Sequence, residues 1–511
     1  MSHTVVRAVR RVPVGGSPRP GRLPGEAEGV VDLRLVGGRI TEVGHRLDAT
    51  GADEVVDGEG RWAIPGLWDQ HTHPVMWALA RRRIDLSGSA DALETVRRVR
   101  EHLDGIPDGD GLVLGFGYRS GGWAESASVA LLDRATGARP VALTSGDGHH
   151  AWLNSAALSR LGLPAREGVL AENEWYAVAP RLEALDPDAR DPLPALRDVL
   201  ADAHARGVVG LVDLEFGSAF RIWPERVGRG LRTMRVRAAT YADHLEEVAD
   251  LGLRTGDPVV PGHPLVTMGP LKVIGDGSLN TLTAWCCSPY LESERLEHPC
   301  GRPNHGFDEL VALMTRAREI GLSAAIHAIG DRAVSTTLDA FEVTGQTGTM
   351  EHAQLVRWAD IPRLARLGVV ASVQPAHAPD DRDVAERWWG DRSERLYAFR
   401  AMVDAGVQLA LGSDAPVSPL DPWLAIACAV HRSMDDREAW HPEQALTVEE
   451  ALAASTDGQG TMEVGSRADV VLLDADPLAG PRGEPAQHAA YLRAMPVAAT
   501  LVDGRVVHTA G

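Results

Sequence analysis

Lysine is almost missing from this chain of 511 residues, because Lys272 is the single lysine among 51 lysine and arginine side chains. Arginine provides surface charge as lysine does, but only lysine can lose its proton and act as a nucleophile, a Schiff-base former or a carbamate carrier. The lone lysine is either a survivor of an arginine-rich composition or a group that the chemistry requires. Its setting favours the second interpretation, because the apolar run from Leu265 to Ile274 ends at Gly275 and predicts a buried strand followed by a turn.

Other absences narrow the class of protein. The four cysteines form no C-x-x-C pair, so we expect neither a disulfide framework nor a thiolate metal site, and a reducing cytoplasm fits. No apolar run approaches the roughly 18 residues of a membrane span, and no apolar segment follows the N-terminal arginines, so we expect neither membrane insertion nor secretion. A net charge of −20 opposes the basic surface that nucleic-acid binding needs. The expected partner is therefore a small molecule in the cytoplasm.

Two β-rich ends flank a middle part of different character. Short β-like runs punctuated by glycine occur within 28–64 and again within 464–507. Together they predict one small β-sandwich domain built from both termini, with 1–64 and 456–511 as its two parts. The middle, 65–455, alternates apolar strand candidates with helical patterns. The strand candidates lie at 66–72, 207–215, 235–242, 265–274, 322–329, 349–353, 367–375 and 406–413. Their number predicts an α/β fold, a (β/α)8 TIM-like barrel, with 88–206 as an insertion after the first strand.

Side chains of the metal-ligand type end several of these strand candidates. His71 and His73 are two residues apart, so in a strand both imidazoles face the same side and can share one metal ion. Later candidates end at His327, at His352 and at Asp414. A single buried histidine is more often a core residue than a ligand, but barrel enzymes assemble their sites at the carboxyl ends of the strands. Four strands that end in this way, together with the lone lysine, predict a metal site.

A known family carries the same motifs in the same order. They are Pro65-Gly66-x-x-Asp69-x-His71-x-His73, Asp147-Gly148-His149, Lys272 to Ser278, His327 to Ala333, Glu351-His352-Ala353, Gln374-Pro375 and Gly412 to Pro416. The chain resembles the metal-dependent amidohydrolase superfamily over nearly its whole length, most closely the branch of N-substituted formamide deformylase-like proteins, amidohydrolase family 3. One departure is that the family commonly continues D-G-S-x-G-S-R-T-A, whereas Asn280 to Ala284 here lacks the arginine. The usual substrate contacts are therefore not implied for this segment.

The resemblance implies a binuclear centre. His71 and His73 would hold one metal ion and His327 and His352 the other, with Asp414 on the first ion. Lys272 would bridge both as a carbamate, which fits the chemistry of a buried lysine, because desolvation favours the neutral amine that takes up carbon dioxide. Four imidazoles and two anionic oxygen donors suit zinc, although cobalt, nickel or manganese also fit.

Further residues are expected to support this centre. Asp414 can accept the proton of the attacking hydroxide and deliver it to the leaving nitrogen. Asp331 and Glu351 neighbour the ligands in sequence and are candidates to hold an imidazole tautomer, with surface roles as the alternative. The substrate-binding candidates are His149 and Trp152 in the insertion, and Gln374 and His377 after the seventh strand. For the first two, packing within the insertion is the alternative.

The resulting hypothesis is an enzyme that hydrolyses a carbon–nitrogen bond of a small apolar amide, such as an N-formyl or N-acyl amine, by metal-activated hydroxide. A deaminase or an ester or lactone hydrolase on the same site is the alternative, because fold and ligands do not fix the electrophile. A non-catalytic barrel that only binds requires loss of ligands, whereas every ligand candidate is present. A homodimer is the assembly expected from its frequency among proteins.

Overall fold

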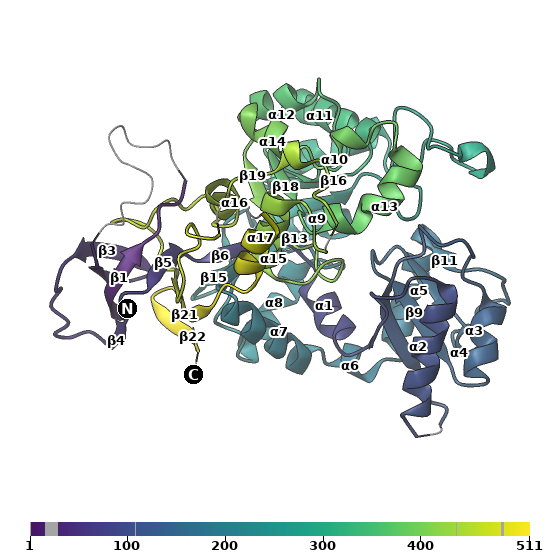
Figure 1. The fold of residues 1–511 in the computed structure, drawn as a ribbon, viewed down its shortest axis with the longest axis horizontal. Helices are drawn as coiled ribbons and strands as arrows, with labels where there is room; N and C mark the ends of the chain where they lie inside the picture. Colours follow the sequence, from purple (N-terminus) through teal and green to yellow (C-terminus); the bar gives the residue numbers. More distant parts are fainter. Residues whose placement is uncertain (1, 16–28, 108, 436, 482–484, 511) are drawn as a thin grey trace.

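The computed structural model describes residues 2–15, 29–107, 109–435, 437–481 and 485–510. These residues form three sheets, which belong to a central barrel, to a layer made by the two chain ends and to an insertion. In Figure 1 the terminal sheet lies at one end of the molecule and the insertion at the other, with the barrel between them. The barrel is therefore the part that joins the other two.

Eight parallel strands form the barrel sheet. They are β6 (Leu67–Thr72), β12 (Val208–Asp213), β13 (Arg235–Thr240), β15 (His263–Ile274), β16 (Ala324–Ala328), β17 (Gly348–His352), β18 (Val370–Val373) and β19 (Leu409–Leu411). Each pairs with the next, and a bridge between Thr72 and Ala415 joins the segment after the last strand to the first strand. Most of their residues are buried, as expected for parallel strands covered on both faces. The predicted barrel is confirmed.

Helices cover the outside of the barrel and share its main hydrophobic core. Those of the barrel and its loops are α1 (Pro74–Ala80), α7 (Leu193–Ala205), α8 (Trp223–Gly228), α9 (Leu245–Asp250), α10 (Phe307–Glu319), α11 (Asp331–Thr344), α12 (Ile361–Leu367), α13 (His377–Trp389), α14 (Phe399–Asp404), α15 (Pro422–His431), α16 (Val448–Ala454) and α17 (Pro485–Arg493). In α10 the buried residues Leu310, Met314 and Ala317 recur every three or four positions, so one face of that helix packs inward. A short strand, β14 (Pro258–Val260), pairs antiparallel with β15.

The insertion has a sheet of its own, which was not expected from the sequence. Its strands are β7 (Ile84–Asp85), β8 (Val113–Tyr118), β9 (Val141–Ser145), β10 (His150–Leu153) and β11 (Leu170–Ala171), and its helices are α2 (Ala92–Asp104), α3 (Val129–Thr136), α4 (Ser155–Arg160), α5 (Glu172–Glu183) and α6 (Pro187–Arg190). Helix α4 begins after Asn154, whose side chain accepts a hydrogen bond from the backbone N–H of Ala157 at 2.9 Å. The insertion thus has the elements of a small α/β unit.

Both chain ends build the third sheet. Its strands are β1 (His3–Arg11), β2 (Val31–Val36), β3 (Arg39–Gly44), β4 (Glu54–Asp57), β5 (Trp62–Pro65), β20 (Val470–Leu473), β21 (Val497–Val502) and β22 (Arg505–Thr509). Val6 and Leu33 from the N-terminal part share a core with Leu472 and Leu501 from the C-terminal part. The joint use of both termini is confirmed, and β1 is a strand that was not predicted. Among the described residues no helix is both long and apolar enough to cross a membrane.

Candidate metal centre

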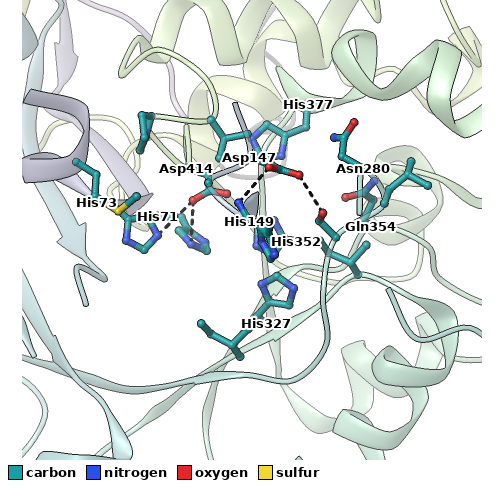
Figure 2. Close-up of a pocket in the computed structure, with 18 of the residues that line it drawn as sticks. His71, His73, Asp147, His149, Asn280, His327, His352, Gln354, His377 and Asp414 are labelled. Atoms are coloured by element: carbon teal, nitrogen blue, oxygen red, sulfur yellow. Dashed lines mark hydrogen bonds and ion pairs between the residues drawn. The ribbon is translucent and has the colours of Figure 1, made fainter. Parts of the chain in front are cut away.

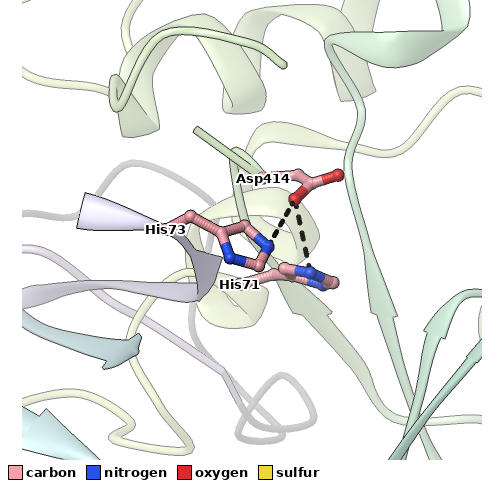
Figure 3. A group of neighbouring side chains, drawn as sticks. All are labelled: His71, His73 and Asp414. Atoms are coloured by element: carbon pink, nitrogen blue, oxygen red, sulfur yellow. Dashed lines mark ion pairs between the residues drawn. The ribbon is translucent and has the colours of Figure 1, made fainter. Parts of the chain in front are cut away.

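The first group of candidate ligands joins the first and the last barrel strands (Figure 3). Asp414 Oδ1 lies 3.3 Å from His71 Nε2 and 3.5 Å from His73 Nε2, and the three ligand atoms lie within 4.8 Å of one another. The backbone N–H of Asp414 donates to the His71 carbonyl at 2.7 Å. Asp414 has a φ of 54°, which is uncommon for a residue other than glycine. Such backbone strain is often found at functional sites.

Close packing of the backbone holds this group in place. A Cβ atom on Gly412 would lie 2.7 Å from the backbone nitrogen of His71, so only glycine fits there without a shift. Asp69 Oδ1 accepts from the backbone N–H groups of His71 and Ser413 at 3.1 and 2.9 Å. The carboxylate of Asp69 therefore connects β6 to the segment after β19, and it fixes the two chain segments that carry the candidate ligands.

A second group shares Asp414 and includes a residue that was predicted only as a substrate contact. Ligand atoms of His352, His377 and Asp414 lie within 4.8 Å of one another. His327 lies beside this group, with its ring edge-on to that of His352 and the ring centroids 4.5 Å apart. His327 and His352 come from the ends of β16 and β17, whereas His377 begins α13 (Figure 2). The structure thus adds His377 to the imidazoles around Asp414.

Lys272 lies in β15 beside the first group. Its side chain is buried, and Nζ lies 3.3 Å from His71 Nε2. Burial lowers the pKa of the Lys272 amine, although the nearby carboxylates of Glu351 and Asp414 oppose this effect. The direction of this shift is the one that favours a neutral, reactive amine.

Two buried carboxylates lie next to imidazoles of the candidate ligands. Glu351 Oε2 lies 2.7 Å from His71 Nδ1, so this carboxylate is next to the imidazole. Asp276 Oδ1 lies 3.4 Å from His327 Nε2, and Asp276 accepts backbone hydrogen bonds from residues 285, 329 and 330. Asp276 was not predicted from the sequence, although it lies two residues after the strand of Lys272. Asp331 differs from its prediction, because its carboxylate accepts from the backbone N–H of Cys287 at 2.7 Å and pairs with Arg395 at 3.1 Å.

Of the four substrate-binding candidates, His149 and His377 line the central cavity and two others do not. Trp152 packs in the core of the insertion, where its indole N–H donates to the Ser128 carbonyl at 2.9 Å. Gln374 is buried with its Nε2 3.4 Å from His71 Nδ1, so it contacts a candidate ligand instead of the cavity. Trp152 lies within β10, and its side chain is on the face of that strand that packs into the core of the insertion.

The cavity between these groups has a volume of about 100 Å³. Figure 2 shows His71, His73 and Asp414 at one side and Asn280 and Gln354 at the other. Further lining residues, absent from the sequence prediction, are Met76, Arg119, Asp147, Tyr176, Phe216, Tyr241, Ser278, Leu279, Ile329 and Asp381. A volume this small is below the roughly 300–1,000 Å³ of sites for drug-sized ligands, so the cavity fits a small molecule.

The protonation states of the candidate ligands are suited to binding a metal ion. Burial is the main cause that lowers the pKa of His71 to about 4, and burial together with the charge of His327 holds the pKa of His352 well below its usual value. Burial opposes ionisation of Asp414, but the His71 and His73 imidazoles outweigh it and keep its pKa below the usual range. Neutral imidazoles and an ionised carboxylate are the forms that bind metal ions.

Unpaired nitrogen atoms give a direct test of the fit. His352 Nδ1 and His377 Nε2 are buried and have no hydrogen-bond partner within the described part of the chain. An unpaired buried polar atom is costly and needs an explanation such as an ion. Imidazole and carboxylate donors are those of zinc and similar divalent ions. The residues present therefore fit a metal centre.

At the insertion side of the cavity, His149 is held as a cation. Its Nδ1 lies 3.0 Å from Glu172 Oε2 and 2.9 Å from the Tyr176 hydroxyl. Burial opposes the charged form, but the contact with Glu172 outweighs burial and raises the pKa of His149 to about 9. The charged imidazole is thus paired within the protein.

Comparisons with known proteins identify relatives of this chain. A model described as the amidohydrolase family matches residues 54–508. N-substituted formamide deformylase of Arthrobacter pascens is 26% identical, covering 92% of this chain and 93% of the relative. Protein LONG AFTER FAR-RED 3 of Arabidopsis thaliana is 28% identical, covering 87% and 84%. The crystal structure of an uncharacterized metal-dependent hydrolase from Pyrococcus horikoshii superposes with a TM-score of 0.74 at 25% identity, covering 94% of this chain and 98% of that one.

Proposed function

This chain belongs to the amidohydrolase family, and from that premise we propose that it hydrolyses the carbon–nitrogen bond of a small apolar N-formyl or N-acyl amine. The family membership and the metal-dependent structural relative make the protein a hydrolase. The observation that carries the proposal is the pair of ligand groups that share Asp414 at one small cavity. The deformylase relative, whose name specifies an N-substituted formamide, supports the choice of amide.

We assign two divalent ions, zinc by donor type, to the two groups. His71, His73 and Asp414 would hold the first ion, and His327 and His352 the second, with His377 as a further donor to it. When bound, such ions polarise a carbonyl group and lower the pKa of water. Lys272 would bridge them after its neutral amine adds carbon dioxide, a step that forms a nitrogen–carbon bond and releases one proton.

The residues of the chain then have separate tasks in hydrolysis. The water oxygen forms the new bond to the carbonyl carbon, and the carbon–nitrogen bond breaks. Asp414 accepts the proton that the water loses and delivers it to the departing nitrogen, so the amine leaves neutral. Glu351 holds His71, and Asp276 holds His327, each through the contact described above. The proton on His149 can be donated in a hydrogen bond to a substrate oxygen, because its ring lines the cavity.

A substrate panel tests the proposal. The purified protein is incubated with N-formyl and N-acyl amines, with esters and lactones of matched size, and with amino-substituted heterocycles, before and after metal removal by chelation. We expect amine release from the amides that is lost on chelation and returns with added zinc. Turnover of only the esters and lactones, or ammonia release from only the heterocycles, would replace the amide proposal with one of these activities.

A further inference from the structure

Polar residues of the insertion and of the barrel form a closed ring of hydrogen bonds at the boundary between these two parts. The insertion residues lie after β9 and at the start of α5, and the barrel residues lie in the loop after β15, the strand of Lys272. We call these residues the polar ring: Asp147, His149, Glu172, Ser278, Thr281 and Thr283. Its members Asp147, His149 and Ser278 line the cavity, so the ring joins both parts of the fold at the candidate site.

Glu172 connects the two sides of the polar ring. Its Oε2 lies 3.0 Å from His149 Nδ1, and its Oε1 accepts a hydrogen bond from the Thr283 hydroxyl at 2.9 Å. Its backbone N–H donates to the His149 carbonyl at 2.8 Å, next to the pairing of β10 with β11. Glu172 has a φ of 50° although it is not glycine, and such strain is often found at functional sites. The two carboxylate oxygens thus join His149 to the barrel loop.

Hydroxyl groups form the barrel side of the polar ring. The Thr281 hydroxyl lies 2.6 Å from that of Thr283 and 3.0 Å from that of Ser278. The Ser278 hydroxyl donates in turn to the Asp147 carboxylate at 3.1 Å. A Cβ atom on Gly277 would overlap the Thr283 hydroxyl, so glycine is needed there for Thr283 to keep its place. The hydroxyl groups therefore link the two carboxylates of the ring.

The polar ring engages one ring nitrogen of His149 and leaves the other toward the cavity. Nδ1 contacts Glu172 and lies 2.9 Å from the Tyr176 hydroxyl. The backbone N–H of His149 donates to Asp147 at 3.1 Å, and Figure 2 shows these two residues next to each other. Nε2 has no hydrogen-bond partner among the residues that the structure describes, and the imidazole lines the cavity. A protonated imidazole held in this way presents one N–H to a bound molecule.

The charges around His149 keep it protonated. Burial opposes the charged form, but the contact with Glu172 on α5 outweighs it, and the carboxylates of Asp147 after β9 and Asp414 after β19 act in the same direction. Together they raise the pKa of His149 to about 9. Leu282 stands where the family commonly has arginine, and it packs against the barrel core. This segment therefore supplies hydroxyl groups to the polar ring and no guanidinium to the cavity.

We propose that Glu172 and Thr283 are positioning residues that aim the Nε2 N–H of His149 at the carbonyl oxygen of the substrate. This inference rests on the proposed amide hydrolysis. Negative charge develops on that oxygen when water adds to the carbonyl carbon, and a donor already held in place stabilises it. The carboxylate of Glu172 fixes the imidazole, and the hydroxyl of Thr283 fixes that carboxylate. The insertion thereby contributes a donor to the reaction, although the candidate metal ligands lie on the barrel.

Kinetic constants of matched variants test the positioning role. His149→Ala should lower kcat by about 10²–10³-fold with little change in KM, the usual loss for one such donor. Glu172→Gln should lower kcat by about tenfold to a hundredfold, and it should add nothing to His149→Ala, because Glu172 acts through His149. Thr283→Val should lower kcat, and Thr283→Ser should restore it. Glu174→Gln is the matched control on α5, because the Glu174 side chain is 57% exposed and pairs with Arg166.

A measurement without substrate separates this inference from the proposed hydrolysis. The pKa of His149 is followed by NMR of zinc-loaded protein labelled with 15N-histidine, and the signal is assigned by its absence in His149→Ala. We expect a pKa well above the ordinary 6.5 in the wild type and in Glu174→Gln, and a pKa near or below 6.5 in Glu172→Gln with an unchanged melting temperature. An unchanged pKa in Glu172→Gln, or additive losses of kcat in the double variant, would overturn the inference. A lowered pKa in Glu172→Gln without amide turnover by the wild type would keep the positioning by Glu172 and reject amide hydrolysis.

Discussion

Replacing Lys272 by arginine keeps the positive charge and removes the amine. Nζ of Lys272 lies 3.3 Å from His71 Nε2, so a zinc ion bound to that nitrogen at about 2 Å would lie within roughly 5 Å of a cation at position 272. At an effective dielectric constant of about 20, repulsion between a unit charge and a divalent ion at this distance is on the order of 6 kcal/mol, or roughly four orders of magnitude in affinity. We therefore expect Lys272→Arg to bind almost no metal and to lose turnover.

The Lys272→Ala variant distinguishes loss of the carbamate bridge from electrostatic repulsion between the side chain at position 272 and the metal ions. It leaves a cavity without a charge, so metal binding should be weaker than in the wild type but stronger than in the arginine variant. A short carboxylic acid added from solution should partly restore metal content and activity in Lys272→Ala alone. Metal analysis, amine release and circular dichroism of the three proteins measure this order. An arginine variant that retains metal and turnover would refute the carbamate assignment.

Three other outcomes are expected. Asp414→Asn should retain the fold and lower turnover by about two orders of magnitude or more, and near-normal turnover would remove its proton-transfer role. Glu351→Gln should weaken metal affinity by about 10–100-fold, because the Glu351 carboxylate lies 2.7 Å from His71 Nδ1, and metal titration checks this. The pKa of His149 is about 9 in the folded protein against an ordinary 6.5, so its stabilisation is present below pH 6.5 and is lost as pH rises through 9. The free energy of unfolding of the wild type should therefore fall relative to His149→Gln between these pH values, by at most roughly 3 kcal/mol, and parallel curves would contradict the pairing with Glu172.

The barrel could be predicted because its strands carry a local signal. Each strand candidate is a short apolar run between helical patterns, and parallel strands buried on both faces need such runs. The terminal strand β1 was hidden because Arg7, Arg10 and Arg11 interrupt its apolar pattern. In the insertion, strands of two to six residues lie between strong helical segments and give little periodicity.

The candidate ligands could be predicted because they lie near the carboxyl ends of strands or directly after them, where the barrel gathers side chains. His377 and Asp276 also follow strands, but their contacts with the centre depend on how loops turn, which no local pattern shows. Phe216 and Tyr241 follow β12 and β13, so position alone could have marked them as lining residues. Tyr176 could not be found in this way, because it reaches the cavity from a separate unit of the fold.

The most direct test of the account is a zinc titration of metal-free protein with amine release as the measured rate. Zinc bound per chain is determined at each point by elemental analysis after removal of free ions. The account predicts that an N-acyl amine is cleaved only by metal-loaded protein and that the rate reaches its plateau at about two ions per chain, the number that a carbamate bridge between two ligand groups requires. Full amine release in the presence of excess chelator, or no amine release at any zinc content, would contradict it.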